Sequence, residues 1–232
     1  MKNLMYCLIL FFSIHSFGQL ITDGPLDPKQ VVDSNRLNDI WQLRFSEQDP
    51  KKVEIDGSLY LFDTWENFGW LKHDNKKYVL RDVNYNILMD QFEYKISNDS
   101  VFIFDNNIDL IYLANKNFKK YYLDANTGNK YCEVLYEGSS YSLLKKYDVR
   151  LREAGPNPLM LKGNSNEFVK SKKYYINNNV TNTLLPIKLK KKDIVALFSN
   201  KENDINSYIK KNKISYKNES DLIKIFKYYE SL

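Results

Sequence analysis

The chain has 232 residues, with 34 Lys and Arg against 29 Asp and Glu and a formal net charge of +5 at pH 7. Hydrophobic residues make up 43% of the chain and aromatic residues 15%, which excludes an intrinsically disordered protein. Nucleic-acid-binding proteins have larger, arginine-containing basic clusters, so we expect no nucleic-acid partner.

The first 18 residues have the pattern of a secretory signal peptide. Lys2 supplies a positive charge, residues 4–12 form an apolar core, and Ser16 and Gly18 form a small-x-small cleavage site. The apolar stretch is shorter than the roughly 20 residues of a membrane-spanning helix. We therefore predict cleavage after Gly18, no transmembrane helix in the mature chain, and a periplasmic or extracellular, surface-associated location.

Cysteine and histidine are scarce after this cleavage. Cys7 and His15 leave with the signal, so Cys132 and His73 remain. One cysteine cannot form an internal disulfide, and the two residues together cannot build a zinc or copper site. Cys132 shares a strand face with Val134, which favours a buried, unreactive thiol over a nucleophile. We take a surface position as the default for His73.

Residues 19–56 form a weakly patterned lead-in. Leu37, Ile40, Trp41 and Phe45 recur at helical spacing, and this predicts one short helix in an otherwise irregular segment.

Residues 57–189 have the pattern of an antiparallel β domain. Short β-branched and aromatic runs alternate with turn residues such as Asp74-Asn75, Asn115 and Asn126-Thr127-Gly128. The predicted fold class is α+β and mainly β: an antiparallel meander, either a sandwich or an open barrel, followed by short C-terminal helices. Two separately folding domains are the alternative.

Alternation within the strands predicts which side chains face the core. One run places Phe92, Tyr94 and Ile96 inward and Gln91, Glu93 and Lys95 toward water. Residues 101–104 and 110–113 are apolar on both faces, so we expect a central strand pair.

Between these two runs, Asp105, Asn107 and Asp109 match the opening of a calcium loop. The later positions of that motif do not match, so a tight hairpin turn is the favoured interpretation.

Residues 190–232 change to helical spacing and predict three short helices packed on the β domain. Ser199 with Glu202, and Asn218 with Asp221, have the spacing of N-terminal caps. Residues 186–232 hold 11 Lys against 6 Asp and Glu, which predicts a solvated basic surface. Contact with an anionic lipid or lipopolysaccharide is the alternative.

Several stretches are similar as a set to a family of uncharacterised exported bacterial proteins. They are residues 57–61, 80–86, 89–93, 142–147 and the tail from Ile209 to Tyr229. The resemblance implies a bacterial origin and one β-rich unit with a Lys-rich helical C-terminus. The resemblance implies no activity and no site residue for this chain.

The sequence contains no catalytic, cofactor-binding or metal-binding motif. It has only eight Gly, none at the spacing of a phosphate-binding loop, and no Gly-x-Ser-x-Gly elbow. We therefore predict no catalytic residue, no metal and no cofactor.

Exposed aromatic rings are the remaining candidates for binding. The adjacent pairs Tyr121-Tyr122 and Tyr174-Tyr175 lie on predicted strands, so one ring of each pair faces outward unless that face is covered. The candidate ligand-binding residues are Trp65 and Trp70, near a turn expected at Gly69, with Tyr122 and Tyr175.

These rings favour a non-catalytic envelope protein that binds another protein or a glycan. The alternative is a hydrolase of envelope polymers that uses paired carboxylates. The sequence leaves the oligomeric state open.

Overall fold

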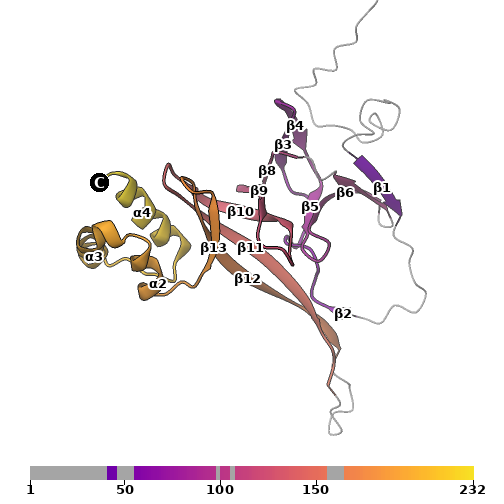
Figure 1. Ribbon diagram of the computed structural model, residues 1–232. Coiled ribbons are helices and arrows are strands. Elements are labelled where there is room, and N and C mark those ends of the chain that lie inside the picture. Colours follow the sequence, from indigo (N-terminus) through magenta and orange to yellow (C-terminus); the bar gives the residue numbers. More distant parts are fainter. Residues whose placement is uncertain (1–40, 46–54, 98–99, 105–107, 156–164) are drawn as a thin grey trace, which may run out of the picture.

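The computed structural model describes residues 41–45, 55–97, 100–104, 108–155 and 165–232. The protein is mainly β, with short helices at the C-terminus, as predicted (Figure 1). The signal peptide and the calcium-loop positions Asp105 and Asn107 lie outside the described residues. No helix in these ranges is both long and apolar enough to cross a membrane.

Four strands form a small antiparallel sheet. In spatial order they are β1 (Trp41–Phe45), β7 (Ser100–Phe104), β6 (Gln91–Ser97) and β5 (Val83–Asn86).

Nine strands form a larger, open sheet. In spatial order they are β13 (Thr183–Ile187), β12 (Asn166–Asn178), β11 (Tyr141–Arg152), β10 (Asn129–Glu137), β9 (Lys116–Tyr122), β8 (Leu110–Leu113), β3 (Gly69–His73) and β4 (Lys76–Leu80). The ninth strand, β2 (Ile55–Asp56), pairs in parallel with β12, so the larger sheet is mixed.

Tight turns join several neighbouring strands where the sequence predicted them. Asp74 and Asn75 between β3 and β4 have φ values of 47° and 62°, and Ala114 and Asn115 between β8 and β9 have 47° and 63°. Two consecutive left-handed residues are the geometry of a type I′ hairpin, for which Asn and Asp are well suited.

The small sheet covers part of one face of the larger sheet. Tyr85 and Phe92 of the small sheet are fully buried against Phe118 and Tyr131 of the larger one. The Phe92 ring lies 5.2 Å from that of Phe118 and 5.0 Å from that of Tyr131, both edge to face. These aromatic contacts, with the aliphatic side chains around them, form the first hydrophobic core.

The C-terminal helices cover another part of the larger sheet and form a second core. They are α2 (Lys191–Ala196), the 3₁₀ turn η1 (Ser199–Lys201), α3 (Glu202–Lys211) and α4 (Glu219–Glu230). Phe198 and Phe226 pack edge to face at 5.2 Å, beside the buried Leu143 and Ile176 of β11 and β12. The three predicted α-helices are therefore confirmed.

One of the two predicted helix caps is present. The Asn218 side chain accepts hydrogen bonds from the backbone N–H groups of Ser220 and Asp221 at the start of α4. The cap predicted at Ser199 is wrong, because η1 begins there and no side-chain bond caps α3.

Two other expectations are wrong, and a third is confirmed only in part. The helix expected to include Trp41 and Phe45 is strand β1, paired along β7. Residues 101–104 and 110–113 are each interior strands, as expected, but they belong to different sheets and do not pair with each other. Glu93 is only 2% exposed, because Tyr60 at 2.7 Å and Asn86 at 2.8 Å donate hydrogen bonds to its carboxylate.

Candidate functional site

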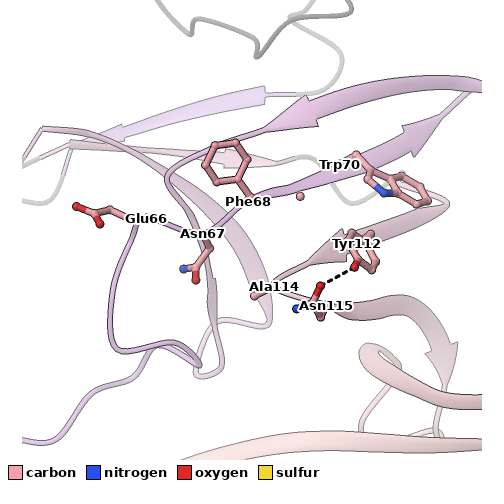
Figure 2. A pocket seen from close by; sticks show the side chains of 8 residues that line it. Glu66, Asn67, Phe68, Trp70, Tyr112, Ala114 and Asn115 are labelled. Atoms are coloured by element: carbon pink, nitrogen blue, oxygen red, sulfur yellow. Dashed lines mark hydrogen bonds between the residues drawn. The ribbon is translucent and has the colours of Figure 1, made fainter.

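A shallow cleft opens on the larger sheet where β3 pairs with β8 (Figure 2). Its volume is about 470 Å³. We call it the ring cleft; it is lined by Glu66, Asn67, Phe68, Gly69, Trp70, Tyr112, Ala114 and Asn115.

Strand register brings the rings of the cleft together. Trp70 lies directly opposite Tyr112, and residues opposite each other in antiparallel strands point to the same face. The two rings stack at 5.6 Å with an angle of 18° between their planes. Phe68 precedes Trp70 by two residues and is 58% exposed, so it adds uncovered ring surface.

Two small residues lie where β3 and β8 approach each other closely. The backbone N–H of Ala114, just after β8, donates to the carbonyl of Phe68 at 3.0 Å. A side chain at Gly69 would meet the carbonyl oxygen of Tyr112 at 2.0 Å, so only glycine allows this close approach. Gly69 begins strand β3 and does not form the expected turn.

Two amide side chains are held in fixed orientations in the cleft. The Asn67 Nδ2 group donates to the carbonyls of Thr64 at 2.7 Å and Val83 at 2.9 Å. The Asn115 Oδ1 atom accepts from the Tyr112 hydroxyl at 2.8 Å (Figure 2). Among the described residues, the Asn67 oxygen and the Asn115 nitrogen have no hydrogen-bond partner, so the cleft offers one acceptor and one donor.

The structure places the four candidate ring residues in different surroundings. Trp70 lines the ring cleft, whereas Trp65 packs edge to face on Tyr60 at 4.7 Å outside it. Tyr122 is 61% exposed at the end of β9, and Tyr175 is half-buried on β12.

Tyr122 and Tyr175 point to opposite faces of the larger sheet. Tyr175 is directly opposite Leu144, so these two side chains share one face of the sheet. The next residue, Lys145, points to the other face together with Glu133 and Phe118, which follow it across the neighbouring strands. Tyr122 is four residues after Phe118 and therefore shares the face of Lys145. The four rings therefore do not make one binding surface.

Sequence reasoning missed Phe68, Tyr112 and the two amides. Residues 110–113 are apolar on both faces, and Phe68 and Trp70 flank a glycine, so neither segment by itself shows which rings face outward. What joins them is a strand pairing across more than forty residues, which local patterns do not encode.

A second cleft of about 530 Å³ lies between β13 and α2. Leu185, Pro186 and Leu197 give it apolar walls, and Asp193 is the one carboxylate among the described residues that line it. The ring cleft likewise has one carboxylate, Glu66, among its described lining residues. Among the lining residues that the structure describes, neither cleft has the pair of carboxylates that most glycoside hydrolases use.

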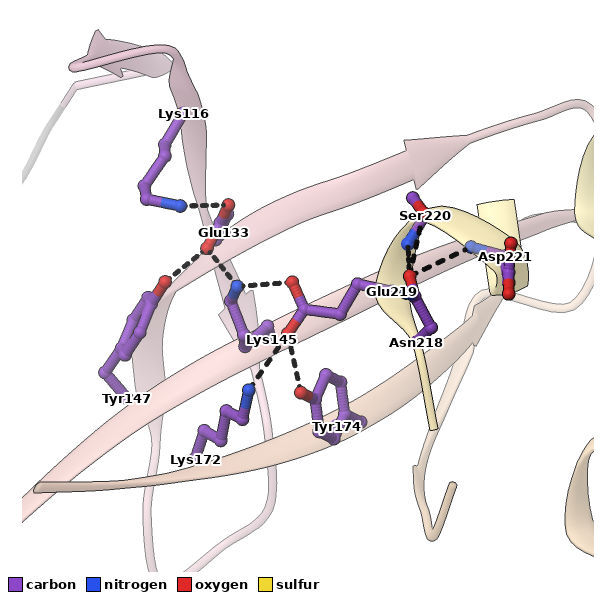
Figure 3. A network of polar contacts seen from close by, with 10 residues as sticks. All are labelled: Lys116, Glu133, Lys145, Tyr147, Lys172, Tyr174, Asn218, Glu219, Ser220 and Asp221. Carbon is purple, nitrogen blue, oxygen red and sulfur yellow. Dashed lines mark hydrogen bonds and ion pairs between the residues drawn. The ribbon is translucent and has the colours of Figure 1, made fainter. Parts of the chain in front are cut away.

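A network of charged and hydroxyl groups connects the sheet to the helices (Figure 3). The buried Lys145 ammonium lies 2.8 Å from Glu133 and 2.8 Å from Glu219. Tyr147 and Lys116 also donate to Glu133, while Tyr174 donates to Glu219 at 2.6 Å. Each carboxylate is thus paired with lysine and hydrogen-bonded by tyrosine, as buried charges require.

The titration of these groups agrees with a structural role. Burial alone would raise the pKa of Glu219, but hydrogen bonds from Lys145 and Tyr174 outweigh burial and lower the pKa to about 2. Burial and the bond to Glu133 raise the pKa of Tyr147. A carboxylate that stays ionised down to such a pH is a poor general acid near neutrality.

Cys132 is fully buried, as predicted. Burial raises the pKa of its thiol to about 12, and the nearby Asp90 carboxylate adds to this rise. His73 is partly exposed beside the turn between β3 and β4 and lies 3.4 Å from Asp74, so its predicted surface position is confirmed in part. The described residues contain no group of three His, Cys, Asp or Glu side chains placed to hold a metal ion.

Comparisons with known proteins identify no relative of this chain. No protein-family model, no curated protein and no solved structure matches it.

Proposed function

We propose that this chain is an exported, non-catalytic protein of the bacterial cell envelope that binds a glycan through the ring cleft. The observation that carries the proposal is the grouping of Phe68, Trp70 and Tyr112 on one sheet face beside the fixed amides of Asn67 and Asn115. Sugars present apolar faces to aromatic rings and hydroxyl groups to amide donors and acceptors.

The cleft is also held in shape before any ligand binds. Trp70 and Tyr112 stack on each other, and hydrogen bonds within the protein orient both amides. A site that is already ordered loses little conformational entropy on binding, which favours a recognition role.

Export is the second part of the proposal and is supported by the charged, apolar and small-residue pattern of residues 1–18. N-terminal sequencing of the protein recovered from the culture medium or periplasm should begin at Gln19. Recovery of an unprocessed chain only from the cytoplasm would contradict export.

Binding can be tested by calorimetric titration of the mature protein with purified envelope glycan fragments. Phe68→Ala removes an exposed ring and should weaken binding by about tenfold, the size expected for loss of one well-placed aromatic contact. Tyr122→Ala is the matched control, since it removes an equally exposed ring outside the cleft. Equal affinity of the Phe68→Ala variant and the wild type would contradict the proposed site.

A further inference from the structure

Three cationic side chains lie on the same face of the sheet as the ring cleft. Val79 of β4 is directly opposite Trp70, so Lys77 and Arg81, two residues to either side of Val79, share the face of Trp70. The Lys77 ammonium lies 4.2 Å from the centre of the Trp70 ring, and the Arg81 guanidinium lies 4.7 Å from the centre of the Phe68 ring. Lys72 is directly opposite Lys77.

These three cations are exposed and lack anionic partners. Within the part of the chain that the structure describes, no ion pair joins Lys72, Lys77 or Arg81 to a carboxylate. Like charges directly opposite each other in a sheet are destabilising. A bound anion would offset the repulsion between Lys72 and Lys77.

The Glu66 carboxylate, the one negative charge among the described residues that line the cleft, lies apart from the stacked rings. Figure 2 shows the Glu66 side chain directed away from Trp70 and Tyr112. Lys77 already lies over the Trp70 ring and Arg81 over the Phe68 ring, so a ligand that approaches these rings meets the two cations first.

We infer that the ligand of the ring cleft is an acidic glycan, a sugar chain that carries carboxylate groups; this inference rests on the proposed function. The exposed Phe68 ring contacts an apolar sugar face, the amides bind hydroxyl groups, and Lys77 and Arg81 pair with the carboxylates. Arginine binds a carboxylate through two parallel hydrogen bonds, which adds orientation to the charge attraction.

The experiment compares acidic oligosaccharides with their own methyl esters. Calorimetry would use the mature protein with hexasaccharides of galacturonate, mannuronate and glucuronate, and with each fully methyl-esterified hexasaccharide. Esterification removes the charge and keeps the sugar ring and its linkages. We expect at least one acid to bind about tenfold or more tightly than its ester, because charged hydrogen bonds outweigh neutral ones by this amount.

Two double variants test whether the cations beside the ring cleft, and not the basic charge elsewhere on the protein, give the preference for the acid. Lys77→Gln with Arg81→Gln should abolish the preference for the acid and leave the affinity for the ester within about twofold. Lys190→Gln with Lys191→Gln, which removes two exposed lysines at the start of α2, should leave both affinities unchanged.

Three results would overturn the inference. Equal affinity for acids and esters would reject the acidic ligand while leaving the proposed glycan-binding function in place. A preference for the acid that survives the double variant would place the charge recognition elsewhere. Failure of every acid and ester to bind would also reject the acidic ligand. The proposed function itself would be contradicted only if the envelope glycan fragments failed to bind as well, and saturable binding of an acidic peptide or an anionic vesicle would then assign the cleft to another ligand class.

Discussion

Lys145 of strand β11 and Glu219 in the first turn of helix α4 form an ion pair of 2.8 Å that joins the larger sheet to the C-terminal helices. The side chain of Lys145 is 6% exposed, and that of Glu219 is 27% exposed. Glu219 also accepts hydrogen bonds from Tyr174 and Lys172, so one carboxylate ties the helices to both β11 and β12 (Figure 3).

Replacing Glu219 by Gln should lower the free energy of unfolding by about 2 kcal/mol. The change leaves the buried Lys145 ammonium with Glu133 alone, and losing one partner of a buried ion pair costs more than the pair itself contributes. Urea denaturation followed by circular dichroism measures the difference. Glu202→Gln at the exposed start of α3 is the control, and equal stability of the two variants would contradict this role of Glu219.

Acid should weaken the attachment of the helices. The pKa of Glu219 is lowered from 4.5 to about 2 in the folded protein, so folding favours its ionised form. Its contribution to stability is complete above about pH 4.5 and is lost as the pH falls toward 2. The difference in unfolding free energy between the wild type and Glu219→Gln should therefore shrink over this range; a constant difference would rule out this titration.

Gly69→Ala should destabilise the protein by about 3 kcal/mol, because the added carbon would meet the Tyr112 carbonyl oxygen and force β3 away from β8. Gly155→Ala is the matched control: a side chain there meets nothing within 4 Å and should change stability by less than about 0.5 kcal/mol. Thermal unfolding of both variants tests the prediction, which fails if Gly69→Ala is as stable as Gly155→Ala.

The Cys132 thiol should not react with a thiol reagent in the folded protein at pH 8. It is buried, and its pKa of about 12 leaves almost no thiolate at that pH. Labelling followed by mass spectrometry should show modification only after unfolding in urea. Rapid labelling of the native protein would place this thiol at the surface.

Much of the fold could be predicted from local patterns. The turn at Asp74 and Asn75 and the helix cap at Asn218 are each encoded within a few neighbouring residues. Such signals specify where elements begin and end. They were sufficient to predict the mainly β fold class and the three C-terminal helices.

Three of the failures share a physical cause, which is contact between distant segments. Glu93 looked like a water-facing residue of an alternating strand, but hydrogen bonds from Tyr60 and Asn86 allow its burial. The segment from Trp41 to Phe45 fits the spacing of a helix and of a strand, and pairing with β7 decides between them. The ring cleft depends in the same way on the pairing of Trp70 with Tyr112.

The most direct test of glycan binding at the ring cleft is to locate a bound sugar by crosslinking. A photoreactive derivative of the acidic oligosaccharide that binds most tightly would be bound to the mature protein and crosslinked by light. The modified peptides would then be identified by mass spectrometry. We predict crosslinks in residues 66–70 and 112–115, competed away by the unmodified sugar. Specific crosslinks confined to other parts of the chain, such as the surroundings of Tyr122 or Tyr175, would contradict binding at the ring cleft.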